Sequence, residues 1–153
     1  MCDDETRGMW VELQAEACIA LSNIACDKAY GVLDQLIESQ IYPDIIFPLY
    51  RNPTTSLDLK YELAFSVCNS LLHCTFEQAY RLVSSGPHLE IVVSALTLIP
   101  GDAGGQLTKV ALSGLGNLFR QCKKQMVKIN QNKQDEFSRY LELPTRNTIG
   151  LIQ

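Results

Sequence analysis

The sequence predicts an all-α fold built from repeated helical units, and three similar segments support that prediction. These segments are EACIALSNIACD at residues 16–27, ELAFSVCNSLLH at 62–73 and KVALSGLGNLFRQ at 109–121. Each has apolar residues at helical spacing, small residues between them and one internal asparagine. The asparagines are separated by 46 residues (Asn23 to Asn69) and 48 residues (Asn69 to Asn117), a period typical of stacked two- or three-helix repeats.

The stretches between these helices also repeat in design. Residues 29–53 predict a short helix, a break near Pro43 and a second helix that ends before Pro53. Residues 76–102 follow the same plan, with a break at Gly86-Pro87 and an end at Pro100-Gly101. Proline cannot continue a helix and glycine can close one, so these positions mark helix boundaries.

The remaining boundaries depend on local signals. Thr55-Ser-Leu-Asp58 predicts a capping box that opens the helix around 62–73. The apolar run at 91–99 has the composition of a strand, but its place in the repeat predicts a helix. The tail from Cys122 to Gln153 is less regular and predicts the start of a further repeat. The chain is therefore expected to form a single domain over 1–153, with the third helix of a first repeat at about 9–27, a second repeat at about 28–74, a third at about 75–122 and a partial fourth at about 123–153.

Composition limits the classes of function. The chain is 46% hydrophobic and 20% charged, which is typical of a folded protein rather than a disordered one. A net charge of −4 argues against a nucleic-acid or anionic-membrane binder, and no apolar run approaches the about 18 residues of a membrane span. The 6 cysteines form no C-x-x-C pair, which favours buried reduced thiols in an intracellular protein. We expect no catalytic residue, metal site or cofactor.

Three motifs resemble the armadillo repeats of the importin-α family. EACIALSNIAC at 16–26 resembles the third helix of such a repeat, in which the pattern is E-A-x-W-x-L-S-N-I. IESQIYPDIIFPLY at 37–50 resembles the step between the first and second helices, and VALSGLGNLFRQCKK at 110–124 resembles one of the last repeats. The resemblance implies a right-handed armadillo-type solenoid of about three repeats with incomplete ends. It also implies a nuclear-transport adaptor of cytoplasm and nucleus, which binds a basic nuclear localisation peptide or an export receptor.

In that family, tryptophan and asparagine residues on the third helices bind the peptide. The matching positions form three ladders at i, i+4 and i+8, namely Ile19-Asn23-Asp27, Phe65-Asn69-His73 and Ser113-Asn117-Gln121. An asparagine amide donates and accepts hydrogen bonds, so it suits a peptide backbone. No ladder contains tryptophan, and Phe65 is a partial substitute as a partner for a cation.

Two alternatives remain open at this point. The asparagines can instead bond the backbone of neighbouring helices and hold the repeats together. The chain can also be a generic armadillo-repeat scaffold for protein interactions, unrelated to nuclear import. Because flanking repeats look missing, we expect apolar faces near Met9–Leu13 and Leu141–Ile152 to be uncovered and to favour self-association.

Overall fold

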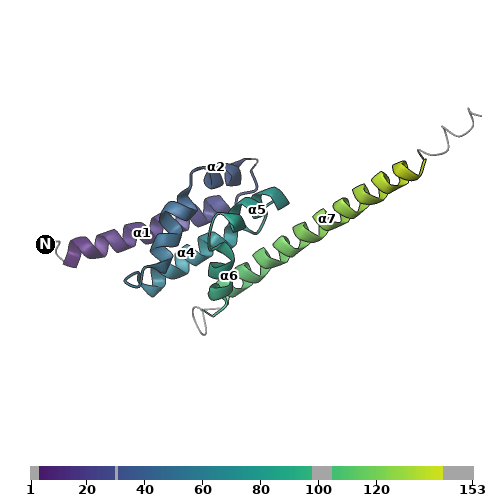
Figure 1. The fold of residues 1–153 in the computed structure, drawn as a ribbon. Coiled ribbons are helices and arrows are strands. Elements are labelled where there is room, and N and C mark those ends of the chain that lie inside the picture. Colours follow the sequence, from purple (N-terminus) through teal and green to yellow (C-terminus); the bar gives the residue numbers. More distant parts are fainter. Residues whose placement is uncertain (1–3, 30, 98–104, 143–153) are drawn as a thin grey trace, which may run out of the picture. The chain divides into compact units, whose positions relative to one another are not determined.

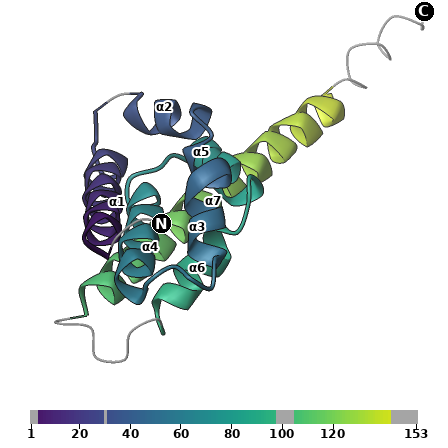
Figure 2. The ribbon, with the colours of Figure 1, turned by 90° about the vertical axis from the view of Figure 1, so that its left-hand side faces the viewer.

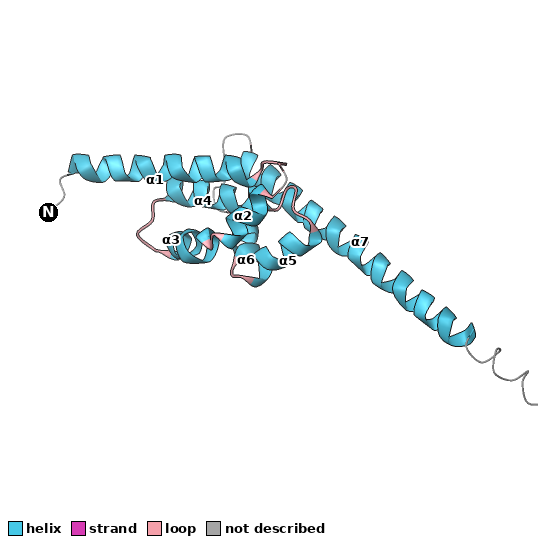
Figure 3. Ribbon diagram, turned by 90° about the horizontal axis from the view of Figure 1, so that it is seen from above, coloured by secondary structure: helices cyan, strands magenta, loops and turns pink. Residues whose placement is uncertain are grey.

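The described part of the chain is helical. The computed structural model describes residues 4–29, 31–97 and 105–142 (Figure 1). Its elements are α1 (Asp4–Ala25), α2 (Val32–Glu38), the π-helical turn η1 (Tyr42–Ile46), α3 (Phe47–Arg51), α4 (Leu57–Ser70), α5 (Phe76–Ser84), α6 (His88–Ala95) and α7 (Gln106–Glu142). Figure 3 shows helices and loops but no strand in these ranges, so the predicted all-α class is confirmed.

The chain divides into two compact units, Met1–Phe119 and Arg120–Gln153, and α7 contributes residues to both. The described backbone of the second unit is a continuous helix as far as Glu142. The tail after Cys122, whose sequence pattern is less regular, is therefore helical up to that residue. The reason is local, because residues 120–142 contain neither proline nor glycine and are rich in lysine and glutamine. The rest of the predicted tail, residues 143–153, lies outside the described residues.

Within the first unit, α4 is the most enclosed helix. It packs along α1, and the two helices lie side by side in Figure 2. It also contacts α3 and α6, and it meets the first part of α7 at Gly114, which lies against Leu71. A helix that touches neighbours on several sides must be apolar or small nearly all round, and eight of its residues are buried: Leu59, Leu63, Ala64, Ser66, Val67, Cys68, Asn69 and Ser70.

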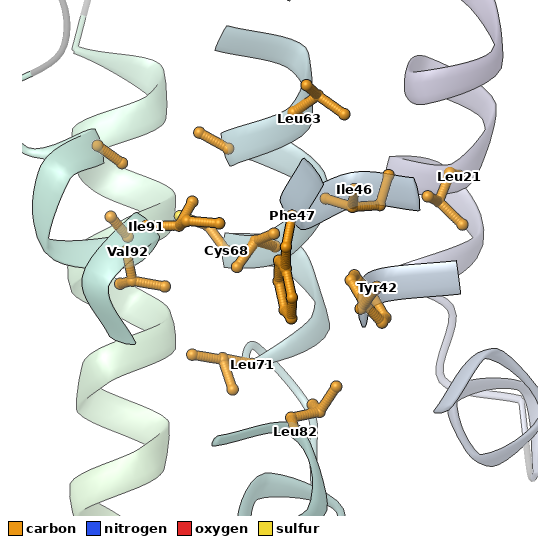
Figure 4. Packing of buried hydrophobic residues seen from close by; sticks show 14 of the residues in the cluster. Leu21, Tyr42, Ile46, Phe47, Leu63, Cys68, Leu71, Leu82, Ile91 and Val92 are labelled. Atoms are coloured by element: carbon orange, nitrogen blue, oxygen red, sulfur yellow. The ribbon is translucent and has the colours of Figure 1, made fainter. Parts of the chain in front are cut away.

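The hydrophobic core of the first unit takes side chains from every helix from α1 to α6 and from the start of α7. Figure 4 shows Leu21 of α1 on one side of the cluster and Ile91 and Val92 of α6 on the other, with Phe47 between them. Among the described cysteines, Cys18, Cys68 and Cys74 are buried free thiols, whereas Cys26 and Cys122 are free and half-buried. No described helix is long and apolar enough to cross a membrane.

The observed helix ends can be compared with the proline and glycine positions predicted to mark them. α3 ends at Arg51, ahead of Pro53, and the break between α5 and α6 falls at Gly86-Pro87, as predicted. The run that starts at Ile91 is helical as far as Ala95, so its helical prediction is confirmed there. The predicted end at Pro100-Gly101 lies outside the described residues.

The predicted capping box is misplaced. Ser56 caps α4, because its Oγ accepts a hydrogen bond from the Leu59 amide at 3.3 Å. Thr55 is not the cap, since its hydroxyl donates to the Leu49 carbonyl. A complete capping box instead opens α5. There the Thr75 hydroxyl accepts from the Gln78 amide and the Gln78 side chain accepts from the Thr75 amide.

Candidate peptide-binding site

Two of the three predicted ladders do not stay on one helix. Helix α1 ends at Ala25, so Asp27 lies in the following turn, where its carboxylate accepts a hydrogen bond from the Ala29 amide. Helix α4 ends at Ser70, so His73 also lies beyond the helix. Both side chains instead line a surface cavity of about 580 Å³ between these turns, α2 and α5. The prediction that Asp27 and His73 share a face with the asparagines is wrong.

The third ladder is divided in another way. Ser113 is exposed on α7, whereas Asn117, one turn later, is buried. Gln121 belongs to the second unit. These three residues therefore do not form one exposed face within the first unit.

Two of the three asparagines bind neighbouring helices. The Asn69 amide donates to the Ser22 hydroxyl at 2.7 Å and to the Ser22 carbonyl at 3.3 Å. The Asn117 amide donates to the Leu71 carbonyl at 2.9 Å and to the Cys74 carbonyl at 3.0 Å. Asn23 alone is exposed. The three asparagines therefore do not share one open surface, and the structural alternative applies to Asn69 and Asn117.

The contrast between the two buried asparagines and the exposed Asn23 can be tested by measuring protein stability. Asn69→Ala and Asn117→Ala are each expected to lower the free energy of unfolding by about 1–2 kcal/mol, because each leaves buried polar groups without a partner. Asn23→Ala is the matched control and is expected to cause no loss, because its side chain is exposed. Urea unfolding followed by circular dichroism measures all three. Equal losses at the three positions would contradict these assignments.

A smaller cavity between α1 and α4 brings together four of the predicted residues. It has a volume of about 260 Å³ and we call it the α1–α4 cavity. Its lining is Ile19, Ser22 and Asn23 of α1, Tyr61, Glu62, Phe65 and Asn69 of α4, and Gln106. Half of this lining is therefore predicted from the sequence, whereas Ser22, Tyr61, Glu62 and Gln106 are not.

Aromatic side chains form one wall of the α1–α4 cavity. Tyr61 and Phe65 are one helical turn apart on α4, and their ring centroids are 5.7 Å apart with an interplanar angle of 44°. Both side chains are half-buried, so part of each ring is exposed. Two adjoining rings offer a larger π surface to a cationic side chain than Phe65 alone.

Carboxylates concentrate negative charge beside these rings. Burial raises the pKa of Glu62, and the nearby negative charge of Glu16 on α1 raises it further. The pKa of Cys18 is also raised, first by burial and then by Glu62. Among the described residues, no ion pair involves Glu16 or Glu62; the ion pairs found join Arg51 with Glu90 and Arg81 with Asp34 and Glu38. A bound cation would relieve this repulsion.

The groups gathered around the α1–α4 cavity are ones that suit binding. The described residues contain no group of three or more histidine, cysteine or acidic side chains placed to hold a metal ion. The α1–α4 cavity offers an exposed amide, two rings and the Glu62 carboxylate, with Glu16 close enough to act on Glu62, and these groups recognise a basic peptide segment. No family model, curated protein or solved structure matches the chain.

Proposed function

We propose that the chain is a non-catalytic helical-repeat scaffold that binds an extended basic peptide in the α1–α4 cavity. The observation that carries this proposal is the meeting of the Tyr61–Phe65 ring pair with Glu62 and Glu16 beside an exposed asparagine. The specific form that we propose is an importin-α-like nuclear-transport adaptor of cytoplasm and nucleus. Its ligand is then a nuclear localisation peptide, and an export receptor is a further partner of the same protein.

Regular spacing of the interhelical contacts supports the armadillo-type part of the proposal. The bond from Asn69 to Ser22 joins residues 47 apart, and the bond from Asn117 to Leu71 joins residues 46 apart. Two further pairs, Asp34 with Gln78 and Tyr50 with Ser94, each join residues 44 apart. Stacked repeats produce such near-constant separations, because equivalent positions of successive repeats meet.

In this proposal, each group in or beside the α1–α4 cavity has a role in binding. The stem of a lysine or arginine lies on the Tyr61 and Phe65 rings, and its charged head pairs with Glu62 and Glu16. Asn23 bonds the peptide backbone, because its amide is exposed. Asn69 contributes to the wall of the cavity while its amide holds Ser22.

Fluorescence anisotropy with a labelled lysine-rich peptide tests this function. We expect a micromolar dissociation constant. This constant should increase as the salt concentration rises, because the charges are partly exposed to solvent. Glu62→Gln and Phe65→Ala should each weaken binding by roughly fivefold, a typical effect of losing one partly exposed charge or one aromatic contact. Phe65→Trp should strengthen binding, because indole is the better cation–π partner.

The matched control is Glu77→Gln, which removes one exposed carboxylate from the larger cavity near Asp27 and His73. It should leave binding unchanged. If Glu77→Gln weakens binding and Glu62→Gln does not, the peptide binds the larger cavity instead. If an acidic peptide binds as well as the basic one, the chain is a generic interaction scaffold rather than a receptor for basic peptides.

A further inference from the structure

An apolar surface with carboxylates occupies the first half of α1, outside the α1–α4 cavity. Met9, Trp10 and Leu13 have exposed fractions of 66%, 59% and 59%. Together with Glu12 and Glu16 they line a surface hollow of about 540 Å³. We call these five residues the Trp10 face. An uncovered apolar surface is predicted here by the sequence, and its exposure is confirmed.

The Trp10 face continues into the α1–α4 cavity. Leu13, Glu16, Ile19 and Asn23 follow one another at spacings of three or four residues, which places them along one side of α1. Glu16 is the junction, because it lines the hollow and also acts electrostatically on Glu62 of the cavity. The two surfaces therefore form one continuous strip.

We propose that the Trp10 face is the second half of the peptide site and takes an apolar side chain of the same basic peptide. This inference rests on the proposed function and adds a substrate class to it. The ligand is an extended peptide with one lysine or arginine for the Glu16–Glu62 pair and one large apolar residue for Trp10 and Leu13.

Charge decides between a basic peptide and other occupants. Among the described residues, no ion pair involves Glu12, Glu16 or Glu62. A second copy docked through the same face would bring Glu12 and Glu16 against like charges, which opposes association. A wholly apolar segment would desolvate these carboxylates without pairing them. A basic segment with an apolar residue satisfies both parts of the strip.

The length of the strip sets the spacing within the peptide. Trp10, which contacts the apolar residue, and Glu16, which pairs with the basic one, are six residues apart on α1, which corresponds to about 9 Å along the helix axis. An extended chain advances about 3.3 Å per residue, so the apolar and basic residues should be separated by about three positions.

Trp10 provides a direct readout, because it is the only tryptophan of the chain. We would titrate the protein with two labelled lysine-rich peptides that differ only in having leucine or serine three positions from the central lysine. The leucine peptide should shift the Trp10 emission to shorter wavelength and bind roughly five- to tenfold more tightly, the effect of burying one large apolar side chain. The serine peptide should bind without shifting the emission.

Two variants assign the effect to the Trp10 face. Leu13→Ser should remove the preference for the leucine peptide and leave the affinity for the serine peptide unchanged. Leu112→Ser is the matched control, since Leu112 is an equally exposed leucine on α7 with an exposed fraction of 56%. It should change neither affinity.

The outcomes separate this inference from the proposed function. If both peptides bind equally and Trp10 emission stays constant, the inference fails and basic-peptide binding stands. If neither peptide binds, the inference and the proposed function both fail. A shift of Trp10 emission with protein concentration alone would assign the face to a second copy and overturn the inference.

Discussion

Gly114→Leu is expected to lower the free energy of unfolding by about 3 kcal/mol, the upper range for overpacking a close contact. A Cβ atom at this position would lie 3.1 Å from the Cys68 carbonyl oxygen and 3.1 Å from the Leu71 Cβ. A leucine adds three further carbon atoms to a contact that one carbon already makes tight. Part of the obstacle is backbone, so rotation of a side chain does not relieve it.

Gly116 is the matched control on the same helix. A Cβ there would meet no heavy atom within 4 Å, and the residue is exposed. Gly116→Leu should therefore stabilise the protein by up to about 1 kcal/mol, because leucine has the higher helix propensity. Urea unfolding followed by circular dichroism measures both variants. Similar effects at the two positions would show that α7 does not pack against α4 through Gly114.

The second large effect concerns His88 and pH. This side chain is fully buried against the rings of Tyr42 and Phe47, each with its centroid 4.9 Å from the imidazole. Burial lowers the pKa of His88 to about 4, although the neighbouring Leu82 backbone offsets part of this effect. The folded protein therefore holds this histidine neutral, whereas the unfolded chain protonates it near its ordinary pKa of 6.5.

The sign of the effect follows from this difference. The unfolded state binds the proton first as pH falls, so the stability from neutral His88 is complete above pH 6.5 and is lost as pH falls toward 4. Between pH 7.5 and pH 5 the expected loss from this group is about 2 kcal/mol. The His88→Leu variant lacks the group and should lose correspondingly less over the same range.

Comparison of the two proteins isolates His88 from other titrating groups. Glu62, with its raised pKa, remains in both proteins and cancels from the difference. Urea unfolding at each pH gives the two free energies. Parallel pH profiles for the native protein and His88→Leu would contradict the assignment of a neutral buried histidine.

Much of the fold is readable from the sequence because its signals are local. Proline and glycine near the helix ends, together with apolar residues at helical spacing, give most of the described helices correctly. The errors are also local. The predicted cap at Thr55 is one residue early, because the sequence does not show which hydroxyl turns toward the helix amides. The length of α7 is explained by the lack of proline and glycine after Arg120, whereas the repeat pattern predicted the start of a further repeat there.

The site is less readable because it depends on contacts between distant residues. The prediction that Asp27 and His73 lie on the same helix face as the asparagines is wrong, because α1 and α4 end before these residues. The partners of Asn69 and Asn117 are 43–47 residues away, so the sequence alone does not show that these amides are used. Glu16 and Glu62 are the first residues of two of the aligned segments. The alignment therefore shows that they are equivalent positions, but not that the two carboxylates interact.

Photocrosslinking tests the central claim, that the α1–α4 cavity binds a basic peptide, most directly. A lysine-rich peptide with a benzophenone beside its central lysine would be irradiated with the 153-residue chain, and the products mapped by mass spectrometry. We predict crosslinks at Ile19–Asn23 of α1 and Tyr61–Phe65 of α4, reduced by Glu62→Gln. Crosslinks confined to the cavity near Asp27 and His73, or spread evenly over the surface, would contradict the account.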